Sequence, residues 1–137
     1  VLENDFINRT NTIKELLVEI EKIDSKRIDH IRSKIQAEVE KLNIDHDNNR
    51  FEQELIYYIE KIDITEEKVR LNNHLNYFLS SLENNTSNGK KLGFIGQEIG
   101  REINTIGSKA NNAEMQKIVI QMKDELEKIK EQLLNVL

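Results

Sequence analysis

No proline occurs anywhere in the 137 residues of this chain, and only five glycines interrupt it. Proline and glycine are the residues that disfavour helices most strongly, so long helices meet few obstacles here. Apolar side chains recur every three or four residues through most of the sequence, which is the spacing of one buried helix face. The sequence therefore predicts an all-α protein, with long helices in antiparallel hairpins and coiled-coil-like seams.

The apolar spacing changes phase within the first predicted helical region. Residues 2–23 and 28–42 each carry a regular apolar stripe, but the two stripes are out of register. Asp24 and Ser25 stand at the change, and both residue types cap helix starts. We therefore expect a kink or a break at Asp24-Ser25.

Polar segments and capping patterns predict the remaining boundaries. Residues 43–49 and 84–89 are rich in asparagine and lack apolar period, which is typical of loops. The segments 63–66 and 111–114 each pair a capping residue with a glutamate three positions later, so we expect a helix to begin at each. The last helix should carry an unbroken apolar seam: Met115, Val119, Met122, Leu126, Ile129, Leu133 and Val136.

Composition excludes several classes of protein. There is no cysteine, which removes disulfides and thiolate metal sites and fits a cytoplasmic location. No apolar run approaches the roughly 20 residues of a membrane span, so we expect no membrane partner. The net charge of −5 would repel nucleic acid unless a local basic patch binds it. The sequence starts at Val1 without methionine, and we expect residues 1–137 to be one helical domain from the C-terminal part of a longer protein.

Familiar catalytic and metal-binding motifs are absent from the sequence. The residue three positions before each histidine is never glutamate, so the paired Glu-x-x-His pattern of di-metal helical bundles does not occur. No phosphate-binding P-loop, His-Glu-x-x-His or EF-hand pattern is present either. His46 lies between two aspartates in a predicted loop and is most simply a solvated turn.

The segment 63–74 combines polar and apolar stripes on one predicted helix. Glu67, Arg70 and His74 fall on one line beside the apolar residues, a half-buried position where ligand geometry can be tuned. The structural alternative is that Arg70 simply bonds a neighbouring glutamate and His74 is an ordinary boundary residue. The pattern alone leaves both open.

The segment 89–109 is unusual because glycine recurs at positions 93, 96, 100 and 107. Each glycine costs a helix about 1 kcal/mol relative to alanine, so close packing of a helix or of a substrate should compensate. Glu98 and Glu102 stand one turn apart, and we expect a cation or a basic residue from another segment to offset their repulsion, since Arg101 is not expected to pair with either. Donors suited to phosphate oxygens accompany them: Gln97, Arg101, Asn104, Ser108 and Lys109.

Two segments, 63–78 and 91–109, closely resemble the C-terminal signature of the YicC-like family of bacterial proteins. The stretch 113–132 is similar to the last helix of that family. The resemblance covers most of residues 50–135, with two separated motifs in the right order.

The resemblance implies a metal-dependent endoribonuclease that acts in bacterial RNA decay. It also implies RNA as a partner, Mn²⁺ or Mg²⁺ as the metal, and assembly into homo-oligomers such as hexamers. Family members carry an additional N-terminal, strand-containing domain, so we expect part of any active site to lie outside this sequence.

With these implications, the residues predict a specific arrangement. We expect the helix of 63–74 to pack beside that of 90–107, which brings together the catalytic candidates Glu67, His74, Glu98 and Glu102. His74, Glu98 and Glu102 would bind the metal. The phosphate would be held by Arg70, Gln97, Arg101, Asn104, Ser108 and Lys109. The alternative is a non-catalytic arm for oligomerisation and RNA gripping, with the chemistry on the other domain.

Overall fold

A computed structural model describes residues 2–41, 48–83, 89–110 and 112–136. These residues form five helices and no strand: α1 (Leu2–Lys41), α2 (Asn48–Ile62), α3 (Thr65–Glu83), α4 (Gly89–Lys109) and α5 (Ala113–Val136). The all-α prediction is confirmed. Most of the two predicted loops, including His46, lies outside the described residues.

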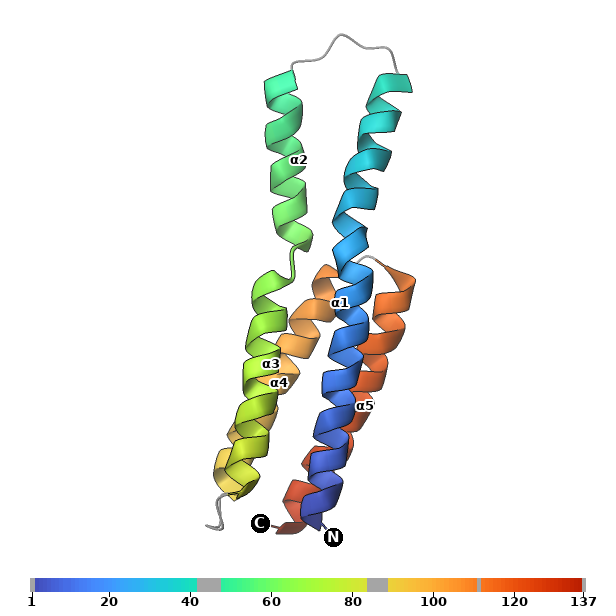
Figure 1. The fold of residues 1–137 in the computed structure, drawn as a ribbon. Helices are drawn as coiled ribbons and strands as arrows, with labels where there is room; N and C mark the ends of the chain where they lie inside the picture. The colour runs from blue at the N-terminus through green and yellow to red at the C-terminus, as the bar shows by residue number, and fades with distance from the viewer. Residues whose placement is uncertain (1, 42–47, 84–88, 111, 137) are drawn as a thin grey trace.

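The N-terminal half of α1 forms an antiparallel four-helix bundle with α3, α4 and α5 (Figure 1). Each helix packs against two neighbours, in the cyclic order α1, α3, α4, α5. The predicted neighbours α3 and α4 therefore do lie side by side, as an antiparallel hairpin.

The bundle core is built from the apolar seams that the sequence predicted. Phe6 and Phe78 meet edge to face with ring centroids 6.0 Å apart, which joins α1 to α3. In α4 the apolar residues at helical spacing are all buried: Leu92, Ile95, Ile99, Ile103 and Ile106. In α5 the seam is likewise buried within the chain: Met115, Val119, Met122, Leu126, Ile129 and Leu133.

Of the predicted kink or break at Asp24-Ser25, the break does not occur, because α1 runs without interruption for 40 residues, about 60 Å. The Asp24 carboxylate does not cap a helix. It is buried and pairs with Arg27 and with Lys68 of α3. The change of apolar phase instead marks where α1 leaves the bundle.

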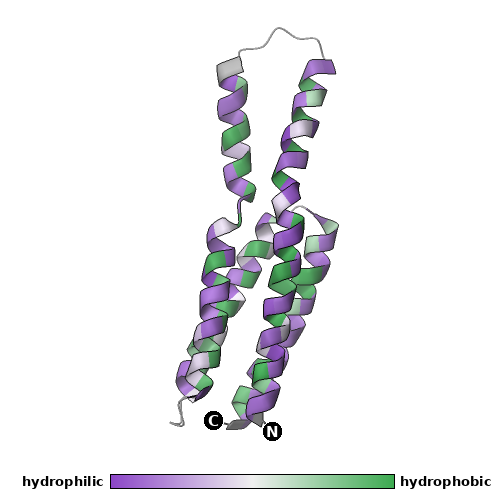
Figure 2. Ribbon diagram, in the orientation of Figure 1, coloured by the Kyte–Doolittle hydropathy of each residue, from purple (hydrophilic) through white to green (hydrophobic). Residues whose placement is uncertain are grey.

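Residues 28–41 of α1 and the whole of α2 extend beyond the bundle as a two-helix arm (Figure 1). An ion pair of 3.5 Å between Arg32 and Glu52 links the two helices. The arm is less well covered than the bundle: Leu55 and Ile62 of α2 are buried, but Tyr58, at the same helical spacing, is exposed. Figure 2 shows hydrophobic and hydrophilic residues interleaved along both arm helices.

Candidate functional site at the α3–α4 seam

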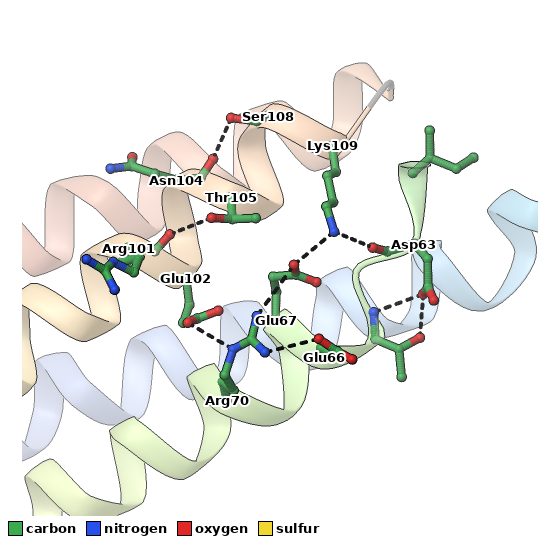
Figure 3. A network of polar contacts seen from close by, with 12 residues as sticks. Asp63, Glu66, Glu67, Arg70, Arg101, Glu102, Asn104, Thr105, Ser108 and Lys109 are labelled. Carbon is green, nitrogen blue, oxygen red and sulfur yellow. Dashed lines mark hydrogen bonds and ion pairs between the residues drawn. The ribbon is translucent and has the colours of Figure 1, made fainter. Parts of the chain in front are cut away.

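Arg70 of α3 reaches across to Glu102 of α4. Its Nε donates to Glu102 Oε1 over 3.1 Å, and its terminal nitrogens lie 3.2 Å from Glu66 Oε2 and 3.6 Å from Glu67 Oε2 (Figure 3). The hydrogen bond with Glu102, followed by that with Glu66, raises the pKa of Arg70 above its usual value. The expected basic residue from another segment is thus Arg70, and it offsets the charge of Glu102.

Lys109 closes the other end of this cluster. Its Nζ donates to Glu67 Oε2 over 2.9 Å and to the carbonyl oxygen of Asp63 over 3.1 Å. Glu67 is 4% exposed, and a buried charge needs a counter-charge. Arg70 of α3 and Lys109 of α4 both supply one. We refer to Glu67, Arg70, Glu102 and Lys109 as the α3–α4 cluster.

One oxygen of Glu102 is unusual. Glu102 is 4% exposed, and its Oε2 is buried with no hydrogen-bond partner among the described residues. A buried polar group without a partner costs about 1–3 kcal/mol, and more when it is charged. The oxygen can accept a proton, a hydrogen bond or a cation without first giving up a protein contact.

Asp63 is a capping residue, as the sequence suggested, and the predicted restart of the helix is confirmed. Its Oδ1 accepts hydrogen bonds from the Thr65 backbone nitrogen, at 3.0 Å, and from the Thr65 hydroxyl. The hydroxyl bond is the main cause of a lowered Asp63 pKa. Glu66 does not complete a capping box, because it pairs with Arg70 instead.

The second predicted helix start shifts by one residue. Asn112 Oδ1 accepts from the backbone nitrogens of Glu114, at 2.8 Å, and Met115, at 3.2 Å. The capping residue is therefore Asn112, and Asn111 lies outside the described residues.

The structure does not gather all of the predicted site residues. His74 is half-buried on α3, and it does not join the glutamates of the α3–α4 cluster in a three-ligand metal group among the described residues. Glu98 lies 3.9 Å from Arg101, which corrects the expectation that these two would not pair: they are three residues apart on one helix. Among the residues that the structure describes, no three histidine, aspartate or glutamate side chains are placed to share a metal ion.

The predicted phosphate donors divide into two groups. Arg70 and Lys109 belong to the α3–α4 cluster. The other four lie exposed at helical spacing on one face of α4: Gln97, Arg101, Asn104 and Ser108. The Ser108 hydroxyl already donates to the Asn104 carbonyl oxygen over 3.0 Å, so its hydrogen is not available to a ligand in this conformation.

The glycines of α4 serve different purposes. A Cβ at Gly100 would lie 3.2 Å from Leu126 Cδ2, and one at Gly107 would lie 3.1 Å from Val119 Cγ1. These two glycines allow α4 to pack closely against α5. A Cβ at Gly93 or Gly96 would meet nothing within 4 Å among the described residues, so packing within this chain does not require those two.

A second buried network, beneath the arm, was missed in the sequence. The Arg27 side chain of α1 is buried. It donates to the carbonyl oxygens of Ile62, at the end of α2, and Lys109, at the end of α4. Asp24 Oδ2 accepts from Lys68 Nζ over 2.6 Å. The i, i+3 spacing of Asp24 and Arg27 could have predicted their ion pair from the sequence, but the burial of that pair could not be predicted.

Comparison with known proteins places this bundle in a family. Residues 20–137 match the family model described as "Endoribonuclease YicC-like, C-terminal", and the chain belongs to that family. The predicted resemblance is confirmed.

Two curated proteins match almost the whole chain. One, named "Probable endoribonuclease YicC", is from Clostridioides difficile (strain 630) and is 37% identical over 98% of this chain. Another of the same name, from Haemophilus influenzae (strain ATCC 51907 / DSM 11121 / KW20 / Rd), is 31% identical over 97% of it. The chain spans about half the length of these relatives, 47% in each case. No helix in the described parts of the chain has the length and apolar content of a membrane span.

Proposed function

We propose that this chain is the helical C-terminal part of an endoribonuclease, and that the α3–α4 cluster contributes to RNA cleavage. The names of the relatives support the reaction class. The buried Oε2 of Glu102, which has no hydrogen-bond partner among the described residues and lies beside Arg70, is the observation that carries the assignment to this cluster.

The residues of the cluster suit different parts of phosphodiester cleavage. Arg70 and Lys109 are partly exposed, with 46% and 31% of their side chains accessible, so both can reach a phosphate while holding a glutamate. They would balance the charge that develops on the phosphate oxygens. Once its side chain turns toward the RNA, Glu102 Oε2 would accept the proton of the attacking hydroxyl group as that oxygen bonds to phosphorus. The phosphorus–oxygen bond to the leaving group breaks, and the leaving oxygen takes a proton from solvent water.

The exposed face of α4 extends this proposal. Gln97, Arg101 and Asn104 would contact the RNA backbone next to the cleaved bond, with Ser108 joining them if its hydroxyl turns away from Asn104. His74 and Glu98 stay in the proposal as candidates at the edge of the cluster, His74 half-buried on α3 and Glu98 on α4.

The metal expectation fits the described residues only in part. Glu102 Oε2 could supply one oxygen ligand to Mn²⁺ or Mg²⁺. His74 and Glu98 do not complete a three-ligand group with it in the described chain. The remaining ligands would come from outside these residues, so no catalytic step is assigned to a metal here.

The experiment is cleavage of a labelled single-stranded RNA by the full-length protein carrying Glu102→Gln. We expect a loss of at least about 100-fold in the cleavage rate, with RNA affinity unchanged. Glu127→Gln, an exposed glutamate on α5, is the matched control and should cleave normally. Normal cleavage by the Glu102→Gln protein would remove this cluster from the mechanism.

The second candidate, a non-catalytic arm for RNA gripping and oligomerisation, also has an observation in its favour. Ile56, Tyr57 and Tyr58 are 41–63% exposed on α2, an apolar surface that a second copy could cover. If the complementary half of the protein cleaves RNA alone at the full rate, this second function is the correct one. Sedimentation of Tyr57→Glu protein would test the contact, since self-association through α2 should then weaken.

A further inference from the structure

A groove lies where α1 passes the start of α5, on a part of the molecule that the proposed cleavage chemistry does not use. Its volume is about 630 Å³. Four basic or titratable side chains of α1 line it at a regular spacing of four residues: Lys22, Lys26, His30 and Lys34. We refer to these residues and the space they line as the basic groove.

The basic groove is positively charged, whereas the protein as a whole is negatively charged. The chain has a net charge of −5, yet among the described residues that line this groove only Glu114 is acidic. The described residues form no ion pair with Lys22, Lys26 or Lys34, whereas Lys68 and Lys109 are both held by carboxylates. Three lysines thus face one space with their charge available to a ligand.

The spacing of these lysines suits a polyanion with regular charges. Residues four apart on a helix are separated by about 6 Å along its axis, so Lys22 and Lys34 span about 18 Å. That step is comparable to the distance between successive phosphates of an RNA strand. Ile23 and Ile31 also line the groove and offer apolar surface to riboses or bases.

The basic groove is connected to the α3–α4 cluster through one residue. Arg27 lines the groove and donates to the Lys109 carbonyl oxygen over 3.4 Å, and Lys109 Nζ contacts Glu67. The groove therefore lies at the end of α4 that carries the cluster's lysine.

We propose that the basic groove binds the phosphate backbone of single-stranded RNA, with Lys22, Lys26 and Lys34 as the phosphate contacts. This inference rests on the proposed function for the choice of RNA as the polyanion. The groove holds the strand beyond the cleaved bond and compensates for the repulsion expected from an acidic protein.

The test is the salt dependence of RNA binding, measured by fluorescence anisotropy with a labelled single-stranded RNA and the full-length protein. In a triple variant with Lys22→Gln, Lys26→Gln and Lys34→Gln, the slope of log affinity against log salt should fall by about 2, since each phosphate contact contributes about 0.7. The affinity at low salt should fall at least about tenfold. A triple variant with Lys90→Gln, Lys117→Gln and Lys123→Gln changes the net charge equally at exposed sites elsewhere, and should keep the native slope.

A second variant keeps the proposal testable even if the triple variant does not fold, because it is expected to strengthen RNA binding. Glu114→Lys removes the acidic residue that lines the groove and should raise both RNA affinity and the salt slope. Unchanged slopes in both groove variants would overturn the proposal. So would displacement of RNA by poly-glutamate at equal charge concentration, because the groove would then bind acidic chains without regard to RNA.

Failure here is distinguishable from failure of the proposed function. The groove triple variant should cleave a substrate of about four nucleotides, too short to span 18 Å beyond the cleaved bond, at the native rate. Glu102→Gln should fail on short and long substrates alike. Slow cleavage of the short substrate by the groove variant would contradict the assignment of these lysines to a separate binding site.

Discussion

Arg27 and Asp24, one helical turn apart on α1, form an ion pair of 2.9 Å in which both side chains are almost completely buried, with 2% and 6% accessible. Lys68 of α3 shares the same aspartate. Burial alone would lower the pKa of Lys68, but the hydrogen bonds to Asp24 and Glu21 outweigh it and raise that pKa. Asp24 therefore contacts both cations at the point where the arm leaves the bundle, and Glu21 adds a second carboxylate to Lys68.

Asp24→Asn should lower the free energy of unfolding by about 3–5 kcal/mol, because it removes the carboxylate that pairs with the buried Arg27 guanidinium, although Lys68 keeps its contact with Glu21. Urea denaturation followed by circular dichroism measures this. Asp29→Asn, exposed on the same helix, is the control and should change stability by less than about 0.5 kcal/mol. A loss below about 1 kcal/mol for Asp24→Asn would show that the pair is not coupled to folding.

Glu102 and Glu67 should respond in opposite ways to loss of charge. Glu102→Gln should leave stability unchanged or raise it by up to about 1 kcal/mol, because the buried oxygen that lacks a partner no longer carries charge. Glu67→Gln should cost about 2 kcal/mol, because Lys109 and Arg70 both lose a charged acceptor. Thermal unfolding of the two variants tests this. An equal loss of stability in both would mean that the charge of Glu102 is balanced as fully as that of Glu67.

The four glycines of α4 should separate into two classes when each is replaced by alanine. Gly93→Ala and Gly96→Ala should each raise the free energy of unfolding by about 1 kcal/mol, because a Cβ meets open space and helix propensity improves. Gly100→Ala and Gly107→Ala should gain less or lose stability, because their Cβ atoms would press on Leu126 and Val119. Equal effects at all four positions would contradict the close approach of α4 to α5.

Metal binding by this chain alone should be weak. The described residues hold no group of three metal-ligating side chains, so calorimetric titration with Mn²⁺ should give a Kd above about 0.1 mM. Glu102→Gln should weaken the binding further, while Glu127→Gln should not change it. A micromolar Kd would show that a complete ligand set forms within this chain in a conformation different from this one.

The sequence by itself determined the helical class and the apolar stripes of α4 and α5, because apolar periodicity and capping depend on residues close together in the chain. The hypothesis that α3 packs beside α4 is confirmed by their contact in the bundle. Tertiary structure decided which distant partners the buried charged residues have. Asp24, expected to end a helix, is held inside one by Lys68, 44 residues away, and Arg70 pairs with Glu102, 32 residues away. The reason is physical: the environment of a charge is set by the elements that pack around it, and one helix shows only its own side of that contact.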